Sequence, residues 1–240
     1  TPRRILLVME NTALSLCGII PMCMIIGVVI ASVTVTGSGT GFSGALATLA
    51  GNNIFLLLLM AALASFVLGM GMPALGCYLI TVTLLGPALI SAGIPPLAAH
   101  LYLFYYGNIS GITPPVAIAT FVASGIADCN PNPAGWQAVV FGLAMYFVPW
   151  LFVFKPEIMF AGPAIFILFE FCCALVGLIF LVSGIRGFLF TRIGVPARIA
   201  CALLGAAGIY PFDKPVEAFL LAASCLVAAA LWLRGKRRPS

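Results

Sequence analysis

Charged residues are scarce in this sequence. Asp, Glu, Lys and Arg together make up 7% of the 240 residues, and none of them occurs between Glu10 and Asp128. Hydrophobic residues make up 63%, and the mean hydropathy is +1.21. Because a soluble domain has roughly 25% charged residues, this composition excludes a water-soluble fold. A bilayer-spanning helix needs about 20 apolar residues, so the charge-free stretch is long enough for several membrane-embedded segments. The sequence therefore predicts an all-α, polytopic membrane protein.

Residues that carry out catalysis are also few. His100 is the only histidine, and the six acidic residues are scattered along the chain. Hydrolysis within a membrane requires a nucleophile with a base, paired acids or a metal cluster, and no such set occurs at a useful spacing. The eight cysteines lie mostly in apolar runs, without the spacing of a metal site or a disulfide framework. We therefore interpret the cysteines as small buried side chains and expect neither an enzyme nor a bound cofactor.

Long apolar runs define the expected helices. A first span is expected from about Ala13 to Val35, ending at the glycine-rich turn TGSGTGFSG, which the short segment Ala45 to Asn53 follows. Later spans are expected at about Trp136 to Phe154, Pro163 to Ile185 and Val216 to Leu233, with a short segment, Pro196 to Tyr210, before the last. The chain is divided accordingly into a scaffold helix with a connecting segment (1–53), a helical hairpin (54–92), a broken helix with a loop (93–134) and the C-terminal transmembrane helices (135–240).

Two interruptions fall in the most hydrophobic part of the chain. Ile54 to Leu68 is only about 22 Å long as a helix, which is shorter than the roughly 30 Å hydrocarbon core, and it meets the stretch GMGMP. Ala74 to Ala92 then returns as a helix, so the sequence predicts a re-entrant hairpin with its tip near Met72. The second interruption, NISGITPP, separates Pro95 to Gly107 from Val116 to Ala127. Glycine and proline break the helical hydrogen-bond ladder at both places.

Non-helical backbone at membrane depth indicates a binding site. Each unpaired N–H or C=O group costs several kcal/mol in hydrocarbon, so such backbone persists only where protein, water or a ligand pairs with it. Freed carbonyl oxygens suit Na⁺, and helix N-termini suit a carboxylate. Either break alone is equally well explained as a packing kink. Two breaks, each beside a short half-helix, favour a transporter site.

The basic residues predict the orientation in the membrane. With the N-terminus inside and residues 54–92 as a re-entrant hairpin, nine of the 11 Lys and Arg residues fall on the cytoplasmic side. These nine are Arg3, Arg4, Arg186, Arg192, Arg198, Arg234, Lys236, Arg237 and Arg238. Lys155 and Lys214 fall outside. Because cytoplasmic loops carry an excess of Lys and Arg, we expect both chain ends in the cytoplasm. Two full spans in place of the re-entrant hairpin would place the later residues on the same sides of the membrane.

The residues around the breaks resemble a known family. LGMGMP (68–73), PPLAAH (95–100) and ITPPV (112–116) are the most specific pieces of a likeness that runs from about Arg3 to Phe160. In order and spacing, this region resembles the large membrane subunit of tripartite ATP-independent periplasmic (TRAP) transporters, especially the fused permeases that work with TAXI-type binding proteins. Residues from Gly162 onward are similar only in character. The resemblance implies an elevator-type secondary transporter of the bacterial inner membrane, built from inverted repeats. It would import a carboxylate-bearing solute with Na⁺ as coupling ion, delivered by a periplasmic solute-binding protein.

The resemblance also implies a set of ion-binding residues. The hairpin tip would be Gly69, Gly71, Met72, Pro73, Ala74 and Leu75, and the helix break would be Asn108, Ser110, Gly111, Thr113, Pro114 and Pro115. Between them they would hold one sodium ion. The chain departs from the family at Ala74 and Leu75, where hydroxyl residues are usual, so side-chain oxygen at the tip is in doubt while backbone carbonyls remain.

The first inverted repeat is absent from this sequence, which has neither an initiator Met nor a visible signal peptide. The chain is therefore expected to be the C-terminal part of a fused permease. Its partners would be the N-terminal part of that permease, including a region like the small subunit, the binding protein and membrane lipid. Nucleic acid is not expected, because the net charge of +5 comes from residues at segment ends. A non-transporting scaffold subunit or remnant remains the alternative.

Three further polar residues have competing interpretations. His100 lies on a short apolar segment, where a hydrogen-bonded packing role is favoured over proton relay. Asp128 lies among turn-forming residues, which favours helix termination over catalysis. Glu170 lies inside the apolar run FILFEFCCALVG, and for this residue a functional role and interfacial snorkelling remain equally open.

Overall fold

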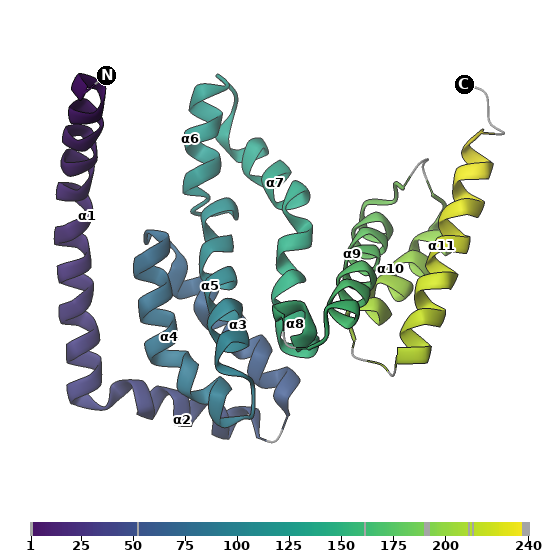
Figure 1. The fold of residues 1–240 in the computed structure, drawn as a ribbon, viewed down its shortest axis with the longest axis horizontal. Helices are drawn as coiled ribbons and strands as arrows, with labels where there is room; N and C mark the ends of the chain where they lie inside the picture. Colours follow the sequence, from purple (N-terminus) through teal and green to yellow (C-terminus); the bar gives the residue numbers. More distant parts are fainter. Residues whose placement is uncertain are drawn as a thin grey trace. The chain divides into compact units, whose positions relative to one another are not determined.

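The computed structural model describes residues 2–51, 53–160, 162–189, 193–210, 212 and 214–236. Within these ranges the chain forms α-helices, short 3-10 helices and turns, and no β-strand, so the expected all-α fold is confirmed (Figure 1). The chain divides into two compact units, Thr1–Ile126 and Ala127–Ser240. By length and composition, two of the described helices are able to cross a membrane, or up to four spans exist if each of two bent helix pairs counts as one.

The first unit begins with a corner that is tighter than expected. Helix α1 (Pro2–Thr36) meets α2 (Ser38–Ala50) at Gly37, which has a φ of 68°, and the chain bends there by 69° (Figure 1). The expectation of a glycine-rich turn over TGSGTGFSG is therefore wrong beyond Gly37, because the following residues are helical. Contacts with α4 compensate for the low helix propensity of glycine: the Ser43 hydroxyl donates to the Leu84 carbonyl at 2.6 Å.

The expected hairpin is present as two helices joined at the predicted break. Helix α3 (Ile54–Gly69) and helix α4 (Ala74–Ser91) pack against each other, and Met70–Pro73 forms the tip. Asn53 caps the start of α3, because its side-chain oxygen accepts the backbone N–H groups of Phe55 and Leu56 at 3.0 and 3.2 Å. The start at Ile54 and the end beside the glycine-rich tip agree with the sequence.

The broken helix follows as α5 (Pro96–Ile109), a 3-10 turn (Ser110–Ile112) and α6 (Ile118–Ile126). Helix α5 packs along both arms of the hairpin (Figure 1). Hydrogen bonds fix it to each arm: the Tyr102 hydroxyl donates to Leu58 O of α3 at 2.9 Å, and His100 Nδ1 lies 2.9 Å from the Tyr78 hydroxyl of α4. The packing role expected for His100 is the one that this geometry supports.

The second unit contains a further break that the sequence did not predict. The expected span Trp136 to Phe154 is instead α7 (Pro131–Phe141), a 3-10 turn (Leu143–Tyr146) and α8 (Val148–Phe154), bent by 62°. Gly142 ends α7, and Pro149, which has no N–H to donate, sits in the first turn of α8. A single straight span at this position is therefore wrong.

The remaining helices agree with the expected segments. They are α9 (Ala164–Arg186), α10 (Val195–Ile209) and α11 (Lys214–Lys236), preceded by a short 3-10 helix (Pro156–Met159). Glycine allows α9 and α10 to approach closely: a Cβ on Gly184 would lie 2.8 Å from the Arg198 carbonyl oxygen. Small residues at a helix interface let backbones approach in this way inside membranes.

Two sequence interpretations concern single residues of these units. All eight cysteines have free thiols, but only Cys77, Cys173 and Cys201 are buried, so the expectation of small buried side chains holds for these three. Asp128 follows the end of α6 with a φ of 50°, in the left-handed region that ends helices. That conformation fits the helix-terminating role expected for Asp128.

Candidate functional site

The two predicted breaks meet in the first unit. Gly69, the last residue of α3, lies directly against the carbonyl oxygen of Gly107 on α5, so that a Cβ at Gly69 would overlap this oxygen. The same Cβ would lie 2.9 Å from Ser110 Oγ. Glycine is therefore the residue that lets the hairpin tip touch the end of α5.

A second glycine holds the other arm of the hairpin at the same place. A Cβ on Gly107 would overlap the sulfur of Cys77, which lies in the first turns of α4. Gly107 is thus enclosed between Gly69 of α3 and Cys77 of α4. Both arms of the hairpin close on the last turn of α5.

The hairpin tip combines exposed backbone with a left-handed glycine. Gly71 has a φ of 79°, which L side chains rarely adopt, and no atom lies within 4 Å of its Cβ position. Among the described residues, no backbone N–H donates to the carbonyl oxygens of Met70, Gly71 or Met72. These three consecutive carbonyls are therefore available as oxygen ligands.

Of the predicted tip residues, Ala74 and Leu75 have a different setting. They are the first two residues of α4, whose N-terminus has no side-chain cap. The first backbone bond into this helix runs from the Cys77 N–H to the Pro73 carbonyl at 3.0 Å, so the N–H groups of the preceding residues lie at a free helix N-terminus. This end of the tip offers donors rather than acceptors.

The break after α5 is formed mainly by internal hydrogen bonds. Ser110 is 2% exposed and its hydroxyl donates to Gly107 O at 2.7 Å, while the Thr113 hydroxyl donates to Ile109 O at 2.7 Å. Asn108 donates its side-chain amide to Phe104 O at 2.7 Å and so belongs to α5. Pro114 and Pro115 follow, joined by a cis peptide bond, and α6 resumes at Ile118.

Gly111 does not have the conformation that would require glycine. It lies in the 3-10 turn without a positive φ, and nothing lies within 4 Å of its Cβ position. A larger side chain there would not be strained by the backbone. The glycines that the geometry requires are Gly69, Gly71 and Gly107.

Sequence reasoning missed one polar side chain beside the breaks. Ser65 is fully buried on α3, one helical turn before Gly69 and on the same face, and its hydroxyl has no hydrogen-bond partner among the described residues. Its carbonyl oxygen lies 4.0 Å from the Cβ position of Gly107. A buried hydroxyl without a protein partner costs free energy, so the Ser65 oxygen is a candidate ligand beside the break. A lone serine in the run LLLLMAALASFVLG gave no signal of this kind.

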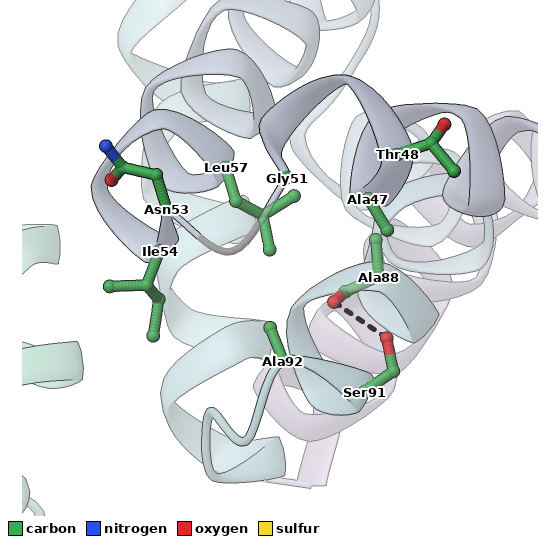
Figure 2. Close-up of a pocket in the computed structure, with 9 residues that line it drawn as sticks. All are labelled: Ala47, Thr48, Gly51, Asn53, Ile54, Leu57, Ala88, Ser91 and Ala92. Carbon is green, nitrogen blue, oxygen red and sulfur yellow. Dashed lines mark hydrogen bonds between the residues drawn. The ribbon is translucent and has the colours of Figure 1, made fainter.

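A cavity of about 630 Å³ lies at the opposite end of the hairpin, between the end of α2, the start of α3 and the end of α4. Figure 2 shows Ala88 and Ala92 facing the space, while the Asn53 amide points away from it. Its hydroxyls are used within their own helices: Ser91 donates to Ala88 O at 3.0 Å, and Thr48 donates to Ala45 O at 2.8 Å. The cavity therefore lacks converging polar groups, and the meeting of the breaks remains the better candidate site.

Glu170 has a clear structural setting in the second unit. It is 1% exposed and accepts hydrogen bonds from the ammonium groups of Lys155, at 2.8 Å, and Lys214. Interfacial snorkelling is therefore excluded for this residue, because a snorkelling side chain places its charge in water. Within the described residues, no group of three or more His, Cys, Asp or Glu side chains could hold a metal ion.

Comparison with known proteins identifies the family. The sequence model of the family described as "Tripartite ATP-independent periplasmic transporter, DctM component" matches residues 1–162 of the 240. The matched region contains the hairpin, the broken helix and their contact, whereas α9, α10 and α11 lie outside it. Neither the curated proteins nor the solved structures include a match to this chain. The chain belongs to the DctM component family of the tripartite ATP-independent periplasmic transporters.

Proposed function

We propose that this chain is the C-terminal part of a permease that imports a carboxylate-bearing solute together with Na⁺. A periplasmic solute-binding protein delivers the solute in this proposal. Membership in the DctM family supports secondary transport by a TRAP system that works with a binding protein and a small component. The observation that carries the sodium assignment is the contact of Gly69 with Gly107 and Ser110, which brings the two helix breaks together.

The cation would bind where oxygen atoms gather around this contact. Na⁺ prefers oxygen ligands, and unwound backbone at a helix break supplies them in transporters. The candidates are the unpaired carbonyls of Met70 to Met72, the Ser110 hydroxyl and the unpartnered hydroxyl of Ser65. A bound ion would relieve the cost of burying the Ser65 oxygen.

The solute carboxylate would bind at the other end of the tip. The N-terminus of α4 carries free N–H groups near Ala74 and Leu75, and a helix N-terminus attracts negative charge. Backbone donors thereby replace the hydroxyl side chains that the family usually has at these two positions. The cation and the carboxylate would then lie on the two sides of a single turn.

The lengths of the hairpin arms support a re-entrant arrangement. Helix α3 has 16 residues, or about 24 Å at 1.5 Å per residue, which is short of the roughly 30 Å hydrocarbon core. In a re-entrant hairpin the tip lies at membrane depth and can alternate between the two sides as one repeat moves against the other. This arrangement requires an N-terminal repeat with its own hairpin, and a permease without one would support the scaffold alternative.

Removal of the Ser65 hydroxyl tests the sodium site. Ser65→Ala in the intact permease with its binding protein should raise the sodium concentration for half-maximal uptake about tenfold, as the loss of about 1.4 kcal/mol of binding free energy gives. In the absence of sodium, the unfolding temperature should stay unchanged or rise, because an unpartnered buried hydroxyl is removed. Uptake and thermal unfolding, each measured against sodium concentration, give the two readouts.

Ser124→Ala is the matched control. Ser124 is 2% exposed on α6, and its hydroxyl donates to Phe121 O at 2.7 Å within the same helix. This variant should keep the sodium dependence of the parent protein. Ser110→Ala is measured in the same way. Equal sodium dependence in both variants and the parent would show that the ion binds elsewhere and that the two breaks are packing kinks.

The orientation of the chain in the membrane is a separate prediction. Because nine basic residues lie on one predicted side and two on the other, we expect residues 1 and 240 in the cytoplasm. Single cysteines introduced at these positions, in a background without accessible thiols, should react with a membrane-impermeant maleimide only after the membrane is permeabilised. Labelling of either end in intact cells would refute the orientation.

A further inference from the structure

Five charged side chains of the second unit form a continuous chain of ion pairs. In order they are Glu157, Lys214, Glu170, Lys155 and Glu217. Lys214 Nζ lies 3.4 Å from Glu157 and also contacts Glu170, while Lys155 Nζ lies 2.8 Å from Glu170 and 2.7 Å from Glu217. The residues come from three separate segments, 155–157, α9 and α11. The chain of ion pairs therefore joins segments that are far apart in the sequence.

The first two members of this row of ion pairs are partly exposed and the other three are buried. The side chains at its start are partly exposed, 30% for Glu157 and 43% for Lys214. Lys155, Glu170 and Glu217 are buried. The row of ion pairs thus has a partly exposed side, formed by Glu157 and Lys214, and a buried side.

The buried end carries one negative charge too many. Three carboxylates and two ammonium groups alternate in sign, so full ionisation leaves a net charge of −1. Glu217 is the last member, and its Oε2 atom is buried with no hydrogen-bond partner among the described residues. Its Oε1 atom is paired with Lys155, but that ammonium group is shared with Glu170. A buried carboxylate that shares its counter-charge is disfavoured, and it is neutralised by taking up a proton.

Among the described residues, the groups that face Glu217 do not offer another counter-charge. Lys155 is shared with Glu170, which also interacts electrostatically with Glu217 and opposes a second negative charge there. The further titratable group of α9 that interacts with these side chains is the thiol of Cys173. Helix α10 contributes Leu204 and Gly208 to the small void beside Glu217, and α11 contributes Ser224. Lys214 precedes Glu217 by three residues on α11, and its ammonium group pairs with Glu170 and Glu157.

A cavity connects this interior with the exposed end. It has a volume of about 270 Å³, and Lys155, Glu157, Glu170, Lys214 and Glu217 all line it. Since a water molecule occupies about 30 Å³ in the liquid, the cavity has room for several. Water within it would join the partly exposed Glu157 and Lys214 to the carboxyl group of Glu217.

We propose that Glu217 is a proton-binding site, protonated at neutral pH and in exchange with bulk water through the charged cavity of the second unit. The proton is taken from water onto Oε2, the oxygen without a partner, while Oε1 keeps its hydrogen bond from Lys155. Glu170 stays ionised, because both of its oxygens accept hydrogen bonds from ammonium groups. With this proton the five side chains sum to zero charge. The site lies outside the region that matches the DctM family, apart from Lys155 and Glu157.

Infrared spectroscopy tests the protonation directly. A protonated carboxyl group has a C=O stretching band that is separate from the bands of carboxylates. The purified intact permease should show one such band at neutral pH, sensitive to deuterium exchange and lost reversibly at alkaline pH. The band should be absent from Glu217→Gln and present in Glu157→Gln.

Thermal unfolding of the same variants gives an independent readout. Glutamine has the shape and charge of a protonated glutamate, so Glu217→Gln should unfold at the same temperature as the parent at neutral pH, or higher. A group that binds a proton in the folded state but not in the unfolded state makes stability fall as pH rises. Glu217→Gln should therefore lose stability less steeply than the parent between mildly acidic and neutral pH.

Glu170→Gln is the matched control, and it should lower the unfolding temperature at neutral pH because it removes the carboxylate charge that pairs with two ammonium groups. Three results would overturn the proposal. One is the absence of the carboxylic acid band from the parent at neutral pH, and another is a Glu217→Gln protein that fails to fold or is destabilised as much as Glu170→Gln. The third is loss of the band when sodium is added at constant pH, which would assign the site to Na⁺ instead.

Discussion

Replacement of Gly69 by alanine is expected to lower the free energy of unfolding by about 1–3 kcal/mol and to abolish transport. The added Cβ would overlap the Gly107 carbonyl oxygen, which is backbone, and would lie 2.9 Å from Ser110 Oγ. Backbone cannot rotate away from the clash as a flexible side chain can, so α3 must move away from α5. The two helix breaks would then separate, and the oxygen atoms of the proposed sodium site would separate with them.

Unfolding in detergent and sodium-dependent uptake are the measurements for this variant. Gly44→Ala is the matched control, because Gly44 lies in helix α2 with no atom within 4 Å of its Cβ position. There alanine should leave stability unchanged or raise it by up to about 1 kcal/mol, since alanine favours helix over glycine. A Gly69→Ala protein as stable and as active as Gly44→Ala would show that the hairpin tip does not need to touch α5.

A double variant distinguishes the Gly69 contact from the Gly107 contact. Gly107→Ala should also destabilise the protein, but its clash is with the Cys77 sulfur, a side-chain atom. Cys77→Ala removes that sulfur and should restore most of the lost stability to Gly107→Ala, while giving no rescue to Gly69→Ala. Equal rescue of both variants, or of neither, would contradict the packing of Gly107 between the two arms of the hairpin.

Local chemistry explains which parts of the fold could be predicted. The breaks at Gly69–Pro73 and Ser110–Pro115 were located from sequence, because glycine and proline act on their own backbone. The corner at Gly37 was predicted too long, since the helical state of the following glycines depends on contacts with α4 that lie about 40 residues away, such as Ser43 with Leu84. The break at Gly142 was missed because a single glycine in an apolar run ends a helix only in some settings.

The sequence predicted the two helix breaks of the candidate site but not the contacts between them. The family resemblance marked the two breaks, but the requirement for glycine at Gly107 depends on which helix packs against it. Ser65 carries no motif, and its significance comes only from burial without a hydrogen-bond partner. Gly111 was predicted as one of the residues of the break, yet it does not have the positive φ that would require glycine there. Backbone angles and side-chain partners of this kind follow from tertiary contacts rather than from residue type.

Two lysines that depart from the predicted charge asymmetry have a role that only the structure shows. Lys155 and Lys214 are the two basic residues that the predicted topology places outside, against the rule that the other nine follow. In the structure these two lysines are the ones paired with Glu157, Glu170 and Glu217. The exceptions to the charge rule therefore marked the members of an ion-pair network.

Removal of the Lys155 ammonium group is expected to destabilise the second unit most strongly. Lys155 is 1% exposed and donates to Glu170 and Glu217, so Lys155→Met leaves both buried carboxyl groups without their shared partner. Breaking a buried pair by removing one member costs about 3–5 kcal/mol, because it leaves a buried charge without its counter-charge. Methionine keeps the length of the aliphatic chain, so lost packing contributes little.

The measurement is thermal unfolding of Lys155→Met beside Lys214→Met, the matched variant at the exposed end of the network. Lys214 is 43% exposed, so water can replace part of its interaction and its loss should cost clearly less. Adding Glu217→Gln to Lys155→Met should recover part of the stability, since one of the two stranded carboxyl groups can then no longer ionise. Glu157→Gln, which neutralises a partly exposed carboxylate, should recover none. If Lys155→Met cost no more than Lys214→Met, the buried carboxyl groups would not depend on their shared ammonium group, and a proton at Glu217 would no longer be required to balance the charge of the network.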